Sequence, residues 1–166
     1  MRSIYKIVVC SLLTLSITSC EKDLLEKEQY QKEIYLIGAY NRVWTTEVSY
    51  SNEEVKTYFT VSSSGTLALD RDVNVKMKIN EELVDIYNKK YWTVLNEDKY
   101  YKSLDTDLYS IPSLENTVIK HAEGISAEVP MLIKTASLKI DQSYVIPVEI
   151  ESTTGYPISE SGYKML

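Results

Sequence analysis

Aromatic and polar side chains that could bind a sugar gather in one short part of the chain, residues 91–107. Two aromatic pairs, Tyr91-Trp92 and Tyr100-Tyr101, flank the polar stretch TVLNEDK. Aromatic rings stack on the apolar face of a sugar ring, while amides and carboxylates bind its hydroxyl groups. In a structural alternative, Tyr91 and Trp92 would close the core below a helix, and the tyrosine pair would only favour a strand. The candidate glycan-binding residues are Trp92, Tyr100, Tyr101, Asn96 and Asp98, with Asp105 and Asp107 nearby.

The sequence contains no set of residues with the spacing of a catalytic or metal centre. His121 is the only histidine, and zinc sites need several Cys or His ligands. The chain also lacks the GxSxG elbow of α/β-hydrolases. Glu81-Glu82 is explained by the positive end of a predicted helix. Asp105 and Asp107 alternate as in a calcium loop, but the glycine and final glutamate of an EF-hand are missing. We therefore predict no enzyme, no catalytic residue, no metal and no cofactor.

The chain begins with the features of a bacterial lipoprotein signal. Arg2 and Lys6 precede an apolar run, and Cys20 ends the lipobox sequence LSITSC. The apolar run is too short for a membrane-spanning helix, which needs about 20 residues. Cleavage after residue 19 would leave Cys20 as the N-terminus for lipidation, and several acyl chains hold a protein on a membrane almost permanently. The alternative is an ordinary secretory signal with an incidental cysteine.

The residues directly after Cys20 predict where the lipoprotein is sent. The cluster Glu21-Lys22-Asp23 resembles the export signal of surface lipoproteins in Bacteroidota, although two leucines interrupt the acids that follow. We expect a lipid-anchored protein of the outer membrane that is exposed on the cell surface. Retention on the periplasmic side is the alternative.

Charge and cysteine usage exclude several classes of partner. Removal of residues 1–19 takes away two basic residues and no acidic one, which moves the net charge from −6 to −8. Such a chain is not expected to bind nucleic acid, whose phosphates need basic patches. Cys10 leaves with the signal and Cys20 carries lipid, so no thiol remains for a disulfide. We predict a signal peptide over residues 1–19, a tether over 20–32 and a β-sandwich domain over 33–166.

Alternating apolar residues predict β-strands along most of that domain. The clearest case is residues 73–79, where Val75 and Met77 belong to the buried face. Asn80 then caps a short helix predicted over residues 81–90. Further strands are predicted over residues 33–40, 43–50, 55–62, 66–69, 117–120, 126–134 and 144–150, with another beginning in 158–166 and a loop or short irregular strands over 92–110. Fourteen tyrosines against one phenylalanine also suit strands. The pattern favours an all-β antiparallel sandwich.

Three segments, residues 72–91, 104–134 and 138–159, carry a resemblance to a known family. They contain the sequences VKMKINEELVDIYN, VIKHAEGISAEVPMLIK and YVIPVEI. In this order they resemble the N-terminal immunoglobulin-like domain of unknown function of Bacteroidota surface lipoproteins. The resemblance implies an immunoglobulin-like β-sandwich that stands ahead of glycan-binding modules or a family-18 endo-β-N-acetylglucosaminidase domain. It implies no catalytic residue, since none is assigned to this domain.

The expected function is that of a lipid-anchored accessory protein of a glycan-acquisition system, which binds glycan weakly or acts as a spacer or docking domain. Two alternatives stay open. The chain could be the non-catalytic N-terminal domain of a glycoside hydrolase or lectin-like protein whose second domain is missing, because the final strand is only beginning at Leu166. It could also be a structural or adhesin-like sandwich. The expected partners are the membrane, a glycan and outer-membrane glycan-uptake proteins.

Overall fold

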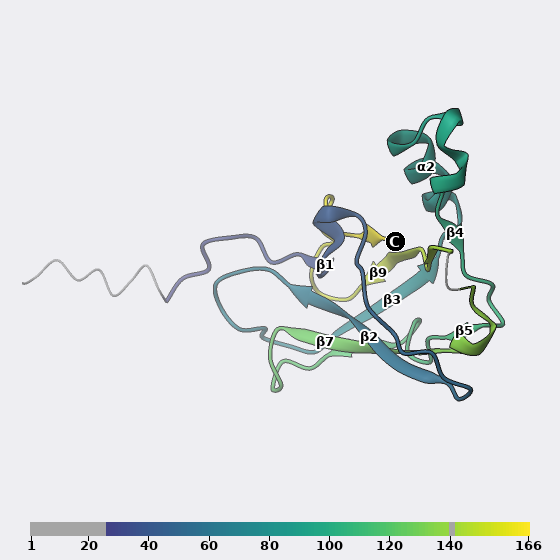
Figure 1. Ribbon diagram of the computed structural model, residues 1–166. Coiled ribbons are helices and arrows are strands. Elements are labelled where there is room, and N and C mark those ends of the chain that lie inside the picture. The colour runs from purple at the N-terminus through teal and green to yellow at the C-terminus, as the bar shows by residue number, and fades with distance from the viewer. Residues whose placement is uncertain (1–25, 140–141) are drawn as a thin grey trace, which may run out of the picture.

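The computed structural model describes residues 26–139 and 142–166, which form two antiparallel four-stranded sheets packed face to face (Figure 1). The first sheet has the order β1 (Ile34–Leu36), β2 (Val55–Ser63), β7 (Ser126–Ile133) and β5 (Tyr109–Ser110). The second has the order β10 (Lys164–Met165), β9 (Val148–Thr153), β3 (Val73–Ile79) and β6 (Thr117–Ile119). The predicted all-β antiparallel sandwich with one short helix is confirmed.

The remaining elements lie between these strands. They are the α-helix α2 (Glu82–Tyr91), the 3-10 helices η3 (Ala39–Asn41), η4 (Val94–Lys99) and η5 (Thr135–Ser137), and the short strands β4 (Lys102–Ser103) and β8 (Tyr144–Val145), which pair in parallel. The predicted loop over residues 92–110 thus contains η4, β4 and β5. None of the helices in the described part of the chain has the length and apolar character that a membrane span requires.

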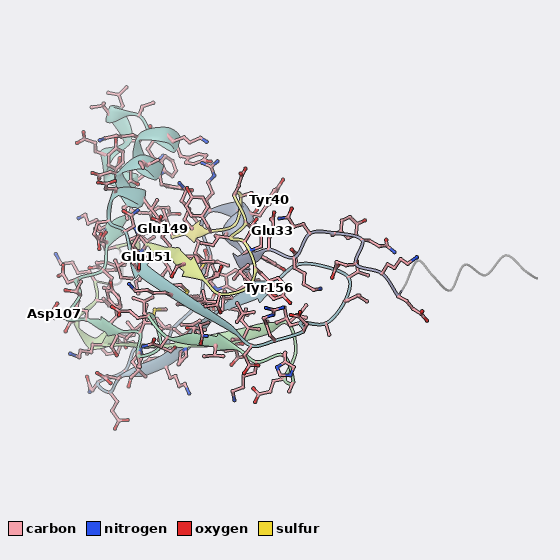
Figure 2. The ribbon with its side chains drawn as sticks, turned by 180° about the vertical axis from the view of Figure 1, so that it is seen from behind. Glu33, Tyr40, Asp107, Glu149, Glu151 and Tyr156 are labelled. Carbon is pink, nitrogen blue, oxygen red and sulfur yellow. The ribbon has the colours of Figure 1, made fainter. Side chains whose placement is uncertain are left out.

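The core follows from the period-two pattern of the long strands. Val73, Val75 and Met77 of β3 are buried, whereas the residues between them are exposed. Across the sandwich, Phe59 of β2 and Val129 of β7 belong to the same apolar cluster. The opposite face of β9 carries Glu149 and Glu151 on the outside of the molecule (Figure 2). The inward and outward faces that the sequence predicts for β3 are therefore confirmed.

Strand β1 closes one edge of the sandwich. It pairs with β2 on one side, and on the other side its amides donate to the C-terminal segment. Ile34 N donates to Pro157 O at 2.8 Å, and Leu36 N donates to Gly162 O at 2.8 Å. These bonds use the edge groups of β1, so this side presents few free backbone donors.

Helix α2 begins one residue later than the sequence predicts. Its N-cap is Glu81, which makes no side-chain capping hydrogen bond, whereas the predicted cap Asn80 lies one residue earlier and its Oδ1 accepts a hydrogen bond from Glu82 N at 3.2 Å. Leu83 and Val84 are buried against Leu166. Ile86 stands three residues after Leu83, at helical spacing, but it is 55% exposed because the helix projects from the sandwich (Figure 1) and only its base is covered.

Four predicted strands are wrong in part or entirely. The strand predicted over residues 33–40 covers only β1, because Gly38 with φ +90° starts the turn into η3. Residues 43–50 form no strand: the hydroxyl groups of Thr46 and of Thr57 on β2 lie 3.3 Å apart, but Trp44 N donates to Leu166 O and not to β2. Residues 66–69 form no strand either, and residues 66 and 67 are bends. The predicted strand over residues 144–150 is two strands in different sheets, because Pro147 has no amide hydrogen to continue a ladder.

The described part of the predicted tether is bound to the loop after β2. The Glu28 carboxylate accepts hydrogen bonds from Lys32 Nζ and from the backbone amides of Thr66 and Leu67. The Lys32 hydrogen bond is the largest cause that lowers the pKa of Glu28 to about 2, and the Thr66 amide adds to it. The part of the predicted tether from Glu28 onward therefore lies against the domain.

Candidate functional site

A helical arm, residues 82–99 of α2 and η4, projects from one end of the sandwich (Figure 1). Its base is fixed by Asn88, which is buried and was not singled out by the sequence. Asn88 Nδ2 donates to Tyr101 O at 2.9 Å, and Asn88 Oδ1 accepts from Tyr101 N at 3.0 Å. The Asn88 side-chain amide thus pairs with both backbone groups of Tyr101, as a neighbouring strand would, and links the helix to the residue before β4.

Four of the five predicted glycan-binding residues lie on or directly beside this arm. Trp92 directly follows α2, is half-buried, and has Lys99 Nζ 5.7 Å from its ring centre. Its Nε1 is buried and has no hydrogen-bond partner among the described residues. Asn96 Oδ1 accepts from Thr93 Oγ1 at 3.0 Å, and Asp98 is exposed. Tyr100 follows η4 and is half-buried. The lysine covers part of the ring that a sugar would need.

Tyr101, the fifth predicted residue, packs against another aromatic ring of the arm. Its ring centre lies 5.5 Å from that of Tyr87, which in turn lies 4.5 Å from that of Tyr91. Burial is the largest cause that raises the pKa of Tyr87. The structure therefore does not bring the five predicted residues into one site. Their role in glycan binding stays a prediction.

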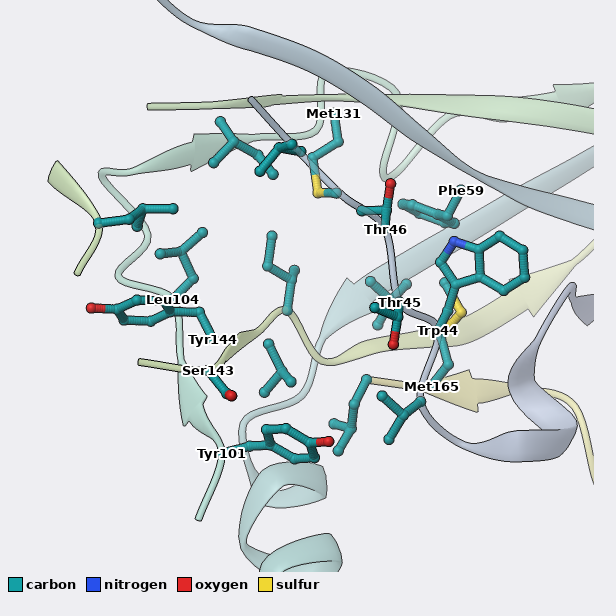
Figure 3. A pocket seen from close by; sticks show the side chains of 18 of the residues that line it. Trp44, Thr45, Thr46, Phe59, Tyr101, Leu104, Met131, Ser143, Tyr144 and Met165 are labelled. Carbon is teal, nitrogen blue, oxygen red and sulfur yellow. The ribbon is translucent and has the colours of Figure 1, made fainter. Parts of the chain in front are cut away.

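A cleft of about 410 Å³ opens between the two sheets, on the side that residues 43–48 cross (Figure 3). Its floor is apolar and buried, and it includes Phe59, Leu104, Met131, Val145 and Met165. Its rim carries aromatic, hydroxyl and amide groups from segments far apart in the sequence. These rim residues are Trp44, Thr45, Thr46, Tyr101, Gln142, Ser143 and Tyr144.

The cleft is lined by uncharged side chains. Among the described residues that line it there is no lysine, arginine, histidine, aspartate or glutamate. Burying a charged ligand group in such a lining would cost several kcal/mol without a compensating partner, so an uncharged ligand is favoured. Sequence reasoning missed the cleft because residues 43–50 were expected to be a strand.

Trp44 is fixed at the rim by a close approach to the backbone. A Cβ atom on Gly38 would lie 2.4 Å from Trp44 Cε3, and Gly38 has φ +90°. Both the space and the backbone angle therefore require glycine at this position. Trp44 N also donates to Leu166 O at 2.9 Å. The indole is 46% exposed, so one part of it packs and another part faces solvent.

The ionisable groups with the largest shifts lie away from both the arm and the cleft. Hydrogen bonds from Arg71, and then from the Tyr156 hydroxyl, hold the pKa of the Asp70 carboxyl well below its usual range. His121 Nδ1 lies 2.6 Å from Asp72 Oδ1, and this contact is the largest cause that lowers the pKa of Asp72. These groups are exposed surface pairs. Among the described residues, no group of three His, Cys, Asp or Glu side chains could hold a metal ion.

Fold and site together define a two-sheet antiparallel β-sandwich domain with one helical arm and a neutral cleft. A family described as a "-like, N-terminal domain" matches residues 30–157, and the chain belongs to this family of N-terminal domains. The resemblance found in the sequence is thereby confirmed. No curated protein matches the sequence.

Several solved structures from Bacteroides share the fold. A Bacteroides ovatus protein of unknown function aligns with a TM-score of 0.67 at 16% identity, covering 82% of this chain and 45% of that one. A proposed carbohydrate-binding protein from the same species has a TM-score of 0.61 at 18% identity, covering 80% and 35%. EndoBT-3987 from Bacteroides thetaiotamicron, solved with a Man5GlcNAc product, has a TM-score of 0.54 at 21% identity, covering 80% and 29%. The chain spans less than half the length of these structures.

Proposed function

We propose that this chain is a non-catalytic accessory domain of a glycan-acquisition system, held on the outer face of the outer membrane by lipid on Cys20. The observation that carries the proposal is membership in a family of N-terminal domains. Support also comes from the shared fold with a proposed carbohydrate-binding protein and with EndoBT-3987. In this proposal the domain contacts glycan weakly, and many copies on one membrane provide avidity.

The membrane anchor is tested by changing Cys20, which lies outside the described residues. The variant Cys20→Ala cannot be lipidated, so it should remain unprocessed or leave the outer-membrane fraction. Fractionation with immunoblotting, together with mass spectrometry of the wild-type N-terminus, measures this. Protease treatment of intact cells then distinguishes surface exposure from periplasmic retention. A Cys20→Ala protein that still fractionates with the outer membrane, and a wild-type N-terminus without acyl mass, would refute the anchor.

A second candidate is a spacer or docking domain. The arm favours it, because Val94 and Leu95 on η4 are 77% and 92% exposed. Large exposed apolar side chains that lie close together often mark a contact with another protein. Gel filtration with light scattering compares the wild type with Val94→Ser/Leu95→Ser. Docking of one copy on another predicts that the wild type self-associates and that the double variant does not. A variant at two other exposed apolar residues, Tyr30→Ser/Tyr50→Ser, is the control.

A further inference from the structure

We propose that the neutral cleft beside Trp44 is a binding site for an uncharged sugar ring. The inference rests on the proposed function and deepens it, since it assigns the glycan contact to a place on the molecule and to a chemical class of glycan. It differs from the prediction made from the sequence, in which Trp92 on the arm provides the stacking surface.

The cleft has the size and layout that such a ligand needs. Its volume of about 410 Å³ lies within the range of roughly 300–1,000 Å³ typical of small-molecule sites. Figure 3 shows Trp44 on one side of the hollow and Tyr101 and Tyr144 on other sides. Aromatic rings at the rim would cover the apolar C–H face of a sugar, and the buried floor would exclude water from it.

Neutral polar groups lie at the same rim. Thr45 and Ser143 carry hydroxyl groups and Gln142 carries an amide, each able to donate and to accept hydrogen bonds. Sugar hydroxyls need partners of this two-way kind. Because no acidic or basic side chain among the described residues lines the cleft, glycans of neutral hexoses or N-acetylhexosamines fit, whereas uronic acids and sialic acids would bury an unpaired charge.

Trp44 is better placed for stacking than Trp92. The Trp44 indole is partly exposed at the cleft and is fixed from behind by Gly38. A fixed ring loses little conformational entropy when a ligand binds, which favours binding. Trp92, by contrast, has Lys99 above its ring and its Nε1 buried.

The two tryptophans of the chain allow a direct test, because each can be made the only fluorescent indole. Trp92→Phe leaves Trp44 as the reporter, and Trp44→Phe leaves Trp92. The purified full chain in detergent is titrated with Man5GlcNAc, maltohexaose and cellohexaose as neutral probes and with an oligogalacturonide as the charged probe. At least one neutral probe should change the emission of Trp92→Phe and leave that of Trp44→Phe unchanged.

Calorimetry with the neutral probe that binds measures the contribution of the ring. Trp44→Ala should weaken binding by about tenfold or more, as expected for loss of an aromatic stacking partner. Tyr40→Ala is the matched control, since Tyr40 (labelled in Figure 2) is an aromatic residue four positions before Trp44 that is 90% exposed and is not among the residues that line the cleft. Its affinity should equal that of the wild type. Circular dichroism checks the fold of each variant.

Each other outcome has a definite meaning. An emission change only in Trp44→Phe would overturn the cleft site in favour of the arm and would leave the proposed function standing. Equal affinity for the charged probe would overturn the assignment to neutral glycans. Absence of heat and of any emission change with all four probes would overturn the cleft inference, while the Cys20→Ala fractionation judges the anchored accessory role independently.

Discussion

A charge placed on the inward face of β3 should unfold the domain, whereas the same charge one residue away should not. Val75 is 1% exposed in a cluster of buried residues that is entirely apolar, and Asn74 is exposed. The backbone of Asn74 is bonded to Thr154, with Asn74 N donating to Thr154 Oγ1 at 2.9 Å. That bond does not involve the Asn74 side chain. Val75→Asp and Asn74→Asp therefore differ in burial and in little else.

The expected cost of Val75→Asp has three parts. Loss of the buried valine side chain costs about 1.5–3 kcal/mol. Keeping the new carboxyl neutral at pH 7, against an ordinary pKa of about 3.9, costs about 4 kcal/mol. Burying that neutral carboxyl without a partner costs about 1–3 kcal/mol more. The total of roughly 7–10 kcal/mol is comparable to the whole stability of a domain, about 5–15 kcal/mol. Asn74→Asp should change the free energy of unfolding by less than about 0.5 kcal/mol.

Thermal and urea denaturation followed by circular dichroism measures both variants of the full chain. Val75→Asp should lose its cooperative transition at pH 7. Relative to the wild type it should regain stability as the pH falls toward about 4. At that pH the new carboxyl is protonated in the unfolded state as well, so keeping it neutral in the core no longer costs free energy. Equal melting temperatures for the two variants would refute the face assignment. A Val75→Asp defect that does not shrink at low pH would refute the argument from charge burial.

Two further predictions concern single contacts. Asn88→Ala leaves the backbone N–H and C=O of Tyr101 without their partner, so the free energy of unfolding should fall by about 1–3 kcal/mol. Hydrogen exchange should accelerate in residues 82–103 before the rest of the sandwich, and uniform acceleration would contradict this reading. For Asp72, the hydrogen bonds of His121 lower the folded-state pKa below 3.8, so the folded state binds the proton less tightly than the unfolded state. This contribution to stability is complete above the ordinary pKa of Asp72 and is lost as the pH falls through the lowered pKa. Asp72→Asn should therefore reduce the dependence of the free energy of unfolding on pH in the acid range. An unchanged acid-denaturation profile would show that the Asp72–His121 pair contributes nothing.

Elements with a strong local period could be predicted from the sequence. The strands β2, β3 and β7 and the helix α2 are confirmed to within about two residues, because each has either a clear alternation or a cap with helical spacing. The wrong strand over residues 144–150 shows the limit of this reasoning. Its apolar alternation continues across Pro147, but the backbone there cannot donate to a ladder, so the chain changes sheets.

The candidate sites were harder to predict, for a physical reason. Trp92, Asn96 and Asp98 could be grouped as a candidate site because they are close in the sequence. A sequence reveals such local groups, but it does not reveal contacts between distant segments. The cleft is assembled from residues as far apart in the sequence as Trp44, Met131 and Met165, which only the packing of the two sheets brings together. Nothing in the spacing of Trp44 and Tyr144 indicates that they share a cavity. Tyr101 is the one predicted residue that also lines the cleft.

The failure of residues 43–50 to form a strand is what leaves the cleft open. Their β-favouring composition is overridden by the turn that precedes them, where Gly38 has φ +90° and Arg42 has φ +64°. Among the described residues, Arg42 is the only non-glycine residue with a positive φ, a conformation that L residues rarely adopt. The turn directs the chain across the end of the sandwich, where Leu166 N donates to Arg42 O at 2.8 Å. Backbone strain of this kind persists where surrounding bonds enforce it and is frequent at binding sites. The strained turn keeps residues 43–50 out of the sheet, and Trp44 therefore lies at the rim of the cleft.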